Sequence, residues 1–312
     1  MHKLLILSRH ARAYHRLIEA ARLPDLEVTS RADLTGAPEC SGDWDIALGE
    51  PALLRPVVPR LQALRWVQST WAGVEPLVEW SSRRDYVLTN ARGVFGALMS
   101  EYVFGYLMVH ERRILERYRS QQAGRWDTTA PGTLRGKQVG LLGVGSIGSS
   151  LARTAKHFGM IVKGYTRASE SCPDVDAYFH GSDRLIFAAE LDYLVCVVPN
   201  TMDTRHLVDA ALIGALPRRA VFVNPGRGQA VDEAALVAAL QAGRLAGAVL
   251  DVFQEEPLPP DHVFWRIPNV LITSHTAALS APEDIAPVFV ENYRRLLSGE
   301  ALQYQVDFER GY

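Results

Sequence analysis

Residues 137–159, KQVGLLGVGSIGSSLARTAKHFG, decide the fold of this chain. An apolar run at 138–142 predicts a buried strand, and residues 146–158 have the apolar spacing of an amphipathic helix that Gly159 ends. Between them lie three glycines spaced G-x-G-x-x-G, which are Gly143, Gly145 and Gly148. In a strand–turn–helix unit this spacing is typical of a turn that binds a dinucleotide.

Each glycine has its own physical role in such a turn. Gly143 allows the tight turn, Gly145 lets a pyrophosphate approach the backbone, and Gly148 lets the helix pack closely on the strand. The anion would lie on the free N–H groups and the positive dipole end of the helix, which begins near Ser146 and Ile147. The alternative is a glycine-rich turn that binds nothing.

Short apolar strands alternate with helical stretches along the whole chain, which indicates α/β structure with mostly parallel sheets. The length of 312 residues suggests one large or two medium domains. We therefore predict two doubly wound, Rossmann-like domains. The predicted strands are 4–7, 27–29, 46–48, 66–68, 86–88, 138–142, 161–165, 191–198, 220–224, 246–252 and 270–273. The predicted helices are 12–23, 97–122, 146–158 and 280–297.

Composition argues against several classes of protein. Thirty-three Lys and Arg residues oppose 35 Asp and Glu residues, so the formal net charge of −2 offers no general attraction to nucleic acid or to an anionic membrane. No apolar run approaches the roughly 20 residues of a membrane span, and the first residues lack the apolar run of a signal peptide. We therefore expect a cytoplasmic protein.

The cysteines Cys40, Cys172 and Cys196 are odd in number and far apart, which argues against a disulfide framework and against a metal cluster. We therefore expect no metal site. Cys196 lies within the apolar run 194–198, so its thiol should be buried and inert.

The end of the next predicted strand, 161–165, selects the dinucleotide. An NAD enzyme has Asp or Glu about 20 residues beyond the glycine motif, where the carboxylate binds the ribose hydroxyls. Here Thr166 occupies that place and Arg167 follows it, so a 2′-phosphate meets no repulsion and gains a counter-charge. This pattern favours NADP over NAD. The alternative is that Arg167 is an ordinary surface arginine.

Three residue types that carry chemistry each follow a predicted strand. An arginine follows 220–224 in NPGRG, two glutamates follow 246–252 in QEEP, and a histidine follows 270–273 in TSHT. Ligands of parallel sheets bind beyond the carboxyl ends of the strands, so these side chains can converge there. A histidine titrates near neutral pH and can donate a proton, a carboxylate can orient it, and an arginine can bind a substrate carboxylate.

From residue 90 to 278 the chain resembles the D-isomer-specific 2-hydroxyacid dehydrogenases. The motifs that carry the resemblance are GLLGVGSIG (140–148), VVPNTMDTRHLV (197–208), NPGRGQAVDEAAL (224–236), LDVFQEEPLP (250–259) and NVLITSHTAA (269–278). The loop VQSTWAGVE (67–75) and the tail QVDFERGY (305–312) look like the branch of that family that reduces glyoxylate and hydroxypyruvate. The resemblance implies three catalytic residues: Arg227 on the substrate carboxylate and keto oxygen, His275 as general acid, and Glu256 rather than Glu255 beside it.

The resemblance also supports a division of the chain that periodicity suggests without proving. Residues 1–95 and 279–312 would form a flavodoxin-like substrate-binding domain, and residues 96–278 an NAD(P)-binding Rossmann domain inserted into it. Members of the family are usually homodimers, so we expect a homodimer.

Further contacts follow from the resemblance alone. In the substrate loop, backbone N–H groups of Ala72, Gly73 and Val74 would bind the carboxylate, and Trp71 would limit substrate size unless it is a core or interface aromatic. Additional cofactor contacts are implied at Pro199, Thr204, Pro225 and Asp251. The chain departs from the family at Ser274, where many members have a proline that restrains the preceding residue.

We therefore predict an NADPH-preferring reductase of a small 2-keto acid that yields the D-2-hydroxy acid, with glyoxylate and hydroxypyruvate as leading substrates and NAD as a possible cofactor. One rival is a dehydrogenase of a bulkier 2-hydroxy acid or of 3-phosphoglycerate. The phosphorylated substrate would need basic residues that the substrate loop, STWAGVEPLVEW (69–80), does not contain. Another rival is a dinucleotide-sensing protein without turnover, against which the intact set of Arg227, Glu256 and His275 argues.

Overall fold

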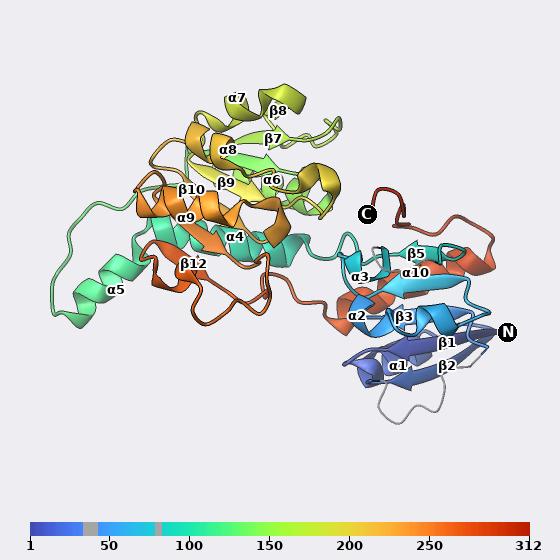
Figure 1. Ribbon diagram of the computed structural model, residues 1–312. Helices are drawn as coiled ribbons and strands as arrows, with labels where there is room; N and C mark the ends of the chain where they lie inside the picture. Colours follow the sequence, from blue (N-terminus) through green and yellow to red (C-terminus); the bar gives the residue numbers. More distant parts are fainter. Residues whose placement is uncertain (34–42, 79–82) are drawn as a thin grey trace. The chain divides into compact units, whose positions relative to one another are not determined.

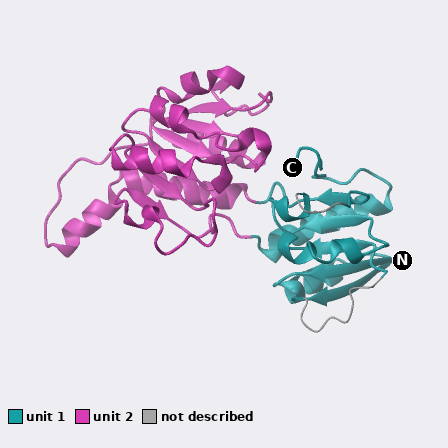
Figure 2. Cartoon of the chain, viewed as in Figure 1, with its two compact units in different colours: residues 1–94, 280–312 teal, residues 95–279 magenta. Residues whose placement is uncertain are grey.

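The computed structural model describes residues 1–33, 43–78 and 83–312. The chain divides into two compact units (Figure 2). Unit 1 consists of Met1–Val94 and Ser280–Tyr312, and unit 2 consists of Phe95–Leu279. Cys40 lies outside the described residues.

Unit 1 contains a sheet of five parallel strands in the order β2-β1-β3-β4-β5. This is the strand order of flavodoxin-like folds. The strands are β1 (His2–Leu7), β2 (Leu26–Arg31), β3 (Ile46–Gly49), β4 (Trp66–Ser69) and β5 (Val87–Thr89).

The last helix of the chain packs in unit 1 (Figure 1). This helix, α10 (Pro282–Leu297), contacts α1 (Ala11–Ala20). The Phe289 ring stacks on the Trp66 ring at a centroid distance of 4.9 Å, and the Tyr293 hydroxyl donates to the carbonyl of Pro24 at 2.8 Å. The remaining helices of unit 1 are the short segments α2 (Pro51–Leu54), η1 (Val58–Arg60) and α3 (Glu75–Val78). Both ends of the chain therefore build the same core.

Unit 2 contains a sheet of seven parallel strands in the order β12-β11-β10-β9-β6-β7-β8. Counted within the unit, this is the Rossmann order 3-2-1-4-5-6 with a seventh strand added, and its order reverses between β6 and β9. The strands are β6 (Gln138–Leu142), β7 (Ile161–Tyr165), β8 (Ala177–Phe179), β9 (Tyr193–Cys196), β10 (Val221–Asn224), β11 (Gly247–Leu250) and β12 (Val270–Ile272).

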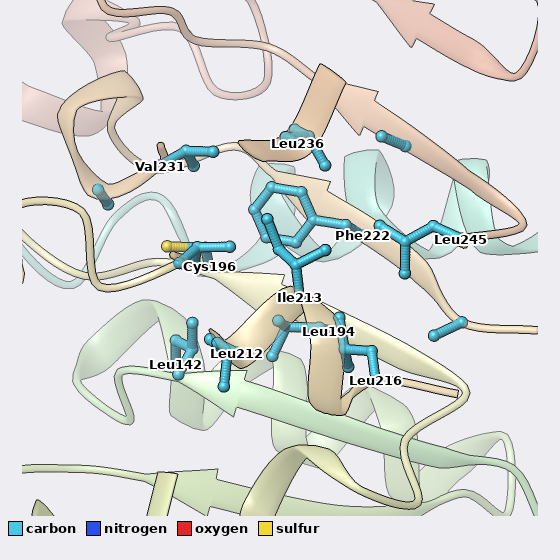
Figure 3. Close-up of a cluster of buried hydrophobic side chains, with 14 of the residues drawn as sticks. Leu142, Leu194, Cys196, Leu212, Ile213, Leu216, Phe222, Val231, Leu236 and Leu245 are labelled. Carbon is cyan, nitrogen blue, oxygen red and sulfur yellow. The ribbon is translucent and has the colours of Figure 1, made fainter. Parts of the chain in front are cut away.

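Helices cover both faces of this sheet. Alternate residues of a strand point to opposite faces, so Leu194 and Cys196 of β9 join one core cluster while Tyr193 and Val195 join the other. Figure 3 shows the first cluster, where Leu194 and Cys196 meet side chains of α8 and α9. The Cys196 thiol is fully buried there, and this burial raises its pKa to about 12, as an inert thiol requires.

The elements that cover these faces follow the sheet order. The first face carries α7 (Arg184–Ala188), α8 (Ala210–Ala215) and α9 (Glu233–Gln241). The opposite face carries α4 (Gly96–Glu111) and α6 (Ser146–His157). Short turns of 3-10 helix lie at Gly181–Asp183 (η2), Met202–Thr204 (η3), Gly228–Ala230 (η4) and Val263–Arg266 (η5).

The prediction of one helix over 97–122 was wrong, because the chain forms α4 and then a separate helix, α5 (Ile114–Gln122). Arg113 between them has a φ of 53°, a left-handed conformation that cannot continue a right-handed helix. Arginine carries no preference for this conformation, so the sequence holds no signal for the break. Figure 1 shows α5 at the far left, projecting from the body of unit 2.

Among the described residues, no helix is both long enough and apolar enough to cross a membrane.

The glycine turn generates a test of the packing. A Cβ atom at Gly148 would lie 2.2 Å from the carbonyl oxygen of Gly143, whereas a Cβ atom at Gly145 would meet nothing within 4 Å. We expect Gly148→Ala to lower the free energy of unfolding by about 1–3 kcal/mol through overpacking, and Gly145→Ala to leave it unchanged or slightly higher. Urea unfolding of both variants measures this difference. Equal stability of the two variants would contradict the close approach of α6 to the turn.

Candidate active site

Three side chains follow three neighbouring strands at the carboxyl edge of the seven-stranded sheet. Arg227 follows β10, Glu256 follows β11, and His275 follows β12. Since β10, β11 and β12 are adjacent and parallel, their carboxyl ends share one edge. The convergence predicted for these three residue types is therefore present in the fold.

His275 and Glu256 form a hydrogen-bonded pair. The His275 Nδ1 lies 2.8 Å from Oε2 of Glu256, and Oε1 of the same carboxylate accepts from the backbone N–H of Phe253 at 2.9 Å. The second ring nitrogen of His275, Nε2, has no hydrogen-bond partner in the part of the chain that the structure describes. The His275 side chain is 50% exposed. One side of the imidazole is thus held by the carboxylate while Nε2 remains available to a substrate.

The pair shifts the pKa of each group. The hydrogen bond that His275 donates to Glu256 raises the pKa of His275 above its usual value, and this effect outweighs partial burial and the nearby positive charge of Arg227. Burial by itself raises the pKa of Glu256, but the hydrogen bonds from His275 and Phe253 outweigh it and lower that pKa. Both shifts favour an imidazolium paired with a carboxylate near neutral pH.

The turn that carries Arg227 is pressed against the loop that carries Glu256. A Cβ atom at Gly228 would lie 2.0 Å from the carbonyl carbon of Phe253, so only glycine permits this approach. The side chain of Asn224, which is 1% exposed, donates to the carbonyl of Arg227 at 3.0 Å and accepts from the N–H of Gly226 at 3.2 Å. The guanidinium of Arg227 donates to the carbonyl of Gly226 at 2.8 Å and acts electrostatically on both Glu256 and His275.

Asp251 braces the loop that carries His275. Its carbonyl accepts from the N–H of His275 at 2.8 Å, and its carboxylate accepts from the N–H groups of Thr276 at 2.8 Å and Ala277 at 2.9 Å. His275 itself has a φ of 56°, a conformation that non-glycine residues rarely adopt. These hydrogen bonds hold the backbone of His275 in place although Ser274 stands where a proline would restrain the loop. Sequence reasoning proposed Asp251 as a cofactor contact and missed this role.

The glycine turn has the features that a pyrophosphate requires. Gly143 has a φ of 93°, and Gly145 is the N-cap of α6. No described side chain caps the first turn of this 12-residue helix, and that turn contains no acidic residue. The free N–H groups of Ser146 and Ile147 and the open space at Gly145 therefore fit an anion.

The other predicted cofactor residues lie at the same edge. Pro199 follows β9, Pro225 follows β10 and Asp251 follows β11. The hydroxyl of Thr204 is used within its own loop, where it donates to the carbonyl of Pro199 at 2.6 Å and accepts from the N–H of Thr201 at 2.9 Å. Thr204 therefore shapes the loop after β9.

Thr166 and Arg167 lie at the end of β7, as predicted. The Thr166 hydroxyl donates to the carbonyl of Ser169 at 2.8 Å, and the exposed Arg167 forms an ion pair with Asp203 at 3.7 Å.

Sequence reasoning missed His180, because β8 was not predicted. The His180 Nδ1 lies 2.9 Å from the carbonyl of Thr166, and its Nε2 lies 2.7 Å from Oε1 of Glu170. These hydrogen bonds, that to Glu170 foremost, raise the pKa of His180. His180 therefore contacts the end of β7 through the carbonyl of Thr166.

The predicted substrate loop follows β4 in unit 1. Ser69 anchors it by exchanging two hydrogen bonds of 2.9 Å with the backbone of Trp71, and Asn90 donates to the carbonyl of Ala72 at 2.9 Å. Trp71 is 42% exposed, so the alternative of a core aromatic is excluded for unit 1.

Several donors of this loop have no acceptor among the described residues. The N–H groups of Ala72, Gly73 and Val74 donate to no acceptor within residues 1–33, 43–78 and 83–312. The hydroxyl of Thr70 is also buried without a partner in those ranges. The loop therefore contains unsatisfied donors of the kind that an anionic group accepts, and the buried Thr70 hydroxyl is one that sequence reasoning missed.

Comparison with known proteins identifies relatives across the whole chain. Residues 104–277 match the family model described as D-isomer specific 2-hydroxyacid dehydrogenase, NAD binding domain. A solved family member from Aeromonas salmonicida is 40% identical, with a TM-score of 0.92, and the match covers 98% of this chain and 99% of that one. A second, from Xanthobacter autotrophicus Py2 in complex with NADPH and MES, is 34% identical, with a TM-score of 0.91 and coverage of 100% and 99%.

A curated relative points to the same group. Glyoxylate/hydroxypyruvate reductase A from Salmonella paratyphi B is 29% identical over 283 residues, which are 86% of this chain and 91% of that protein. The family model covers more than half of the chain, and the fold agrees with that of the solved family members. This chain belongs to the D-isomer specific 2-hydroxyacid dehydrogenase family.

Proposed function

We propose that this protein is an NADPH-preferring reductase that converts a small 2-keto acid, with glyoxylate or hydroxypyruvate as leading substrates, into the D-2-hydroxy acid. The observation that carries the proposal is the His275–Glu256 hydrogen bond of 2.8 Å, with the Arg227 guanidinium acting on both groups. The name of the Salmonella relative and the NADPH bound to the Xanthobacter relative support the substrate class and the cofactor. In this proposal unit 2 binds the cofactor and unit 1 supplies the substrate loop.

The cofactor, when bound, supplies the hydride that reduces the keto carbon. The side chains of this chain do the rest. Arg227 pairs with the substrate carboxylate and polarises the keto oxygen, so that negative charge developing on that oxygen is stabilised. His275 donates the proton from Nε2 to the same oxygen. Glu256 holds the imidazole through Nδ1 and stabilises the imidazolium before the proton is transferred.

The substrate loop binds the other side of the carboxylate through the N–H groups of Ala72, Gly73 and Val74. The buried hydroxyl of Thr70 lies beside them in the chain and has no partner in the described part of the protein. Burial of an unsatisfied hydroxyl costs about 1–3 kcal/mol, which a bound carboxylate or hydroxyl would recover. Trp71 is exposed enough to form a wall of the pocket, and its bulk restricts the substrate to short acids.

Rival functions receive less support. A dehydrogenase for a phosphorylated acid needs cations near the substrate loop, and the loop 69–78 contains none. A binding protein without turnover has no use for a carboxylate that orients an imidazole. Both rivals are distinguished from the proposal by a kinetic assay.

Steady-state rates with a panel of 2-keto acids test the proposal, each acid being assayed with NADPH and with NADH. We expect the highest kcat/KM for glyoxylate or hydroxypyruvate with NADPH. The cofactor preference should be at least about 10-fold, since an exposed charge-assisted contact gives the lower end of its usual range. A higher kcat/KM with NADH, or with a bulky or phosphorylated acid, would contradict the proposal.

Variants at the end of β7 assign the cofactor preference to its residues. Thr166→Asp should weaken the binding of NADPH by repulsion and strengthen the binding of NADH through hydrogen bonds to the ribose. Arg167→Ala should weaken the binding of NADPH alone. Gly145→Ala, which has room for its Cβ atom, should weaken the binding of both cofactors, because the new methyl group blocks the pyrophosphate rather than the 2′-phosphate.

The pH dependence tests the acid. Reduction needs the imidazolium, so kcat/KM should fall as the pH rises through the raised pKa of His275. His275→Gln should lower kcat by about 10²–10⁴-fold. Glu256→Gln removes the main cause of the raised pKa, so the alkaline limb of the profile should move to lower pH. The matched control is Glu255→Gln, one residue earlier and exposed, which should leave the limb in place. A limb that moves equally in both variants would refute the assignment to Glu256.

We further propose that the active form is a homodimer in which a second copy covers α5. No residue of α5 is buried, and a nine-residue helix without packing is marginal in water. Tyr118 in α5 is 58% exposed, and Trp126 in the following loop is 93% exposed. These apolar surfaces fit an interface better than solvent.

Light scattering measures the mass in solution, which for a dimer is twice 34.5 kDa. Trp126→Asp should shift the protein toward the monomer. The control is Ile186→Asp on α7, where the side chain is 66% exposed and no interface is proposed, and this variant should keep the dimer mass. A monomeric wild type, or a Trp126→Asp variant that remains fully dimeric, would refute this interface.

A further inference from the structure

A series of hydrogen-bonded, partly buried hydroxyl groups connects α4 to the loop that carries His275. The Tyr102 hydroxyl lies 2.8 Å from Oγ1 of Thr273, and the Thr273 hydroxyl donates to Oδ1 of Asp251. Asp251 is 1% exposed and accepts three further hydrogen bonds from the N–H groups of His275, Thr276 and Ala277. This series of hydrogen bonds therefore runs from a helix on one face of the sheet to the backbone of the proposed acid.

The number of available protons fixes which group donates and which accepts in this series of hydrogen bonds. Thr273 has one hydroxyl proton, and the carboxylate of Asp251 can only accept, so that proton goes to Asp251. The Tyr102 hydroxyl must then donate to Oγ1 of Thr273. Burial raises the pKa of Tyr102, so it keeps its proton and remains a donor throughout the working pH range.

The Tyr102–Thr273 hydrogen bond joins the first and the last parts of unit 2 along the sequence. The chain passes from unit 1 into unit 2 between Val94 and Phe95, and it leaves unit 2 between Leu279 and Ser280. Tyr102 is in the first helix after the first passage, and Thr273 begins the loop just before the second. The hydrogen bond between them ties these two segments together within unit 2.

We propose that Tyr102 is a positioning residue for the reaction, and that its hydroxyl, acting through Thr273 and Asp251, holds His275 in the left-handed conformation that aligns its ring with Glu256. The strained φ of 56° needs support from its surroundings. The carbonyl of Asp251 holds the N–H of His275, and the carboxylate that Thr273 contacts holds the N–H groups of the next two residues, Thr276 and Ala277. This inference rests on the proposed role of His275 as the acid.

Tyr102→Phe removes one oxygen atom and keeps the packing of the ring. We expect kcat to fall about 10-fold or more with little change in the KM of NADPH, because a small displacement of an acid costs rate rather than cofactor affinity. The alkaline limb of the kcat/KM profile should also move to lower pH, since a looser His275–Glu256 hydrogen bond raises the pKa of His275 less. The charged groups that act on His275 are Glu256, Arg227 and Asp251, and this variant leaves all three unchanged.

The matched control is Tyr106→Phe. Tyr106 lies one turn further along α4, its ring is 4.8 Å from that of Tyr102, and it also faces the charge of Asp251. Its hydroxyl makes no hydrogen bond within the described residues, so its loss should leave rate and pH profile near those of the wild type.

Thr273 provides a second pair of variants. Thr273→Ser keeps the hydroxyl and should retain the wild-type rate, whereas Thr273→Val removes it and should reproduce the defect of Tyr102→Phe. The decreases in kcat caused by Tyr102→Phe and Thr273→Val should be non-additive in the double variant, because both variants break the same series of hydrogen bonds. Additive losses would overturn the proposal, as would a Tyr102→Phe variant with the rate and pH profile of the wild type or of Tyr106→Phe.

A titration of the His275 ring by NMR in the cofactor-free protein keeps this test separate from the proposed activity. The pKa of His275 should be lower in Tyr102→Phe than in the wild type and unchanged in Tyr106→Phe. An unchanged His275 pKa in Tyr102→Phe would refute the positioning role even if the enzyme is active. A lowered pKa in a protein without reductase activity would instead refute the proposed function.

Discussion

The geometry at the carboxyl edge of the seven-stranded sheet depends on the hydrogen bonds that the buried Asp251 accepts. Its carboxylate stands at the end of β11, and together with the carbonyl of the same residue it accepts the hydroxyl of Thr273 and three successive N–H groups of the loop after β12. A loop bound at four points by one residue has little freedom, which allows His275 to keep an unfavourable backbone conformation. In this conformation the imidazole lies within hydrogen-bond distance of Glu256.

Close backbone approach is the second constraint. The Arg227 turn and the Glu256 loop touch at Gly228, where a side chain would collide with the backbone of Phe253. Because two neighbouring parallel strands end side by side, this contact brings a cation and a carboxylate near one imidazole. The same edge holds the uncapped start of α6, so the groups that suit a dinucleotide and the groups that suit a keto acid lie along one rim of one sheet.

The end of β7 is shaped by residues from more than one strand. Thr166 and Arg167 belong to β7 and its loop, but His180 follows β8 and reaches back to the carbonyl of Thr166. Its partner Glu170 fixes the ring and favours its charged form. Each basic side chain at this edge is paired with an acidic one, His180 with Glu170 and Arg167 with Asp203.

Apart from β8, local patterns in the sequence determined the strands of both sheets, together with the glycine turn and the strand-end positions of Arg227, Glu256 and His275, because alternation and glycine spacing act over a few residues. The tertiary structure alone decided the rest. The break at Arg113 is a backbone conformation that arginine does not signal, and β8 was not predicted from the sequence. The left-handed His275 and the hydrogen bonds that join Tyr102, Thr273 and Asp251 depend on contacts between segments far apart in the chain. Hydrogen bonds of that kind leave no periodic trace in the sequence, since any polar residue of suitable size satisfies them once the fold has brought the two segments together.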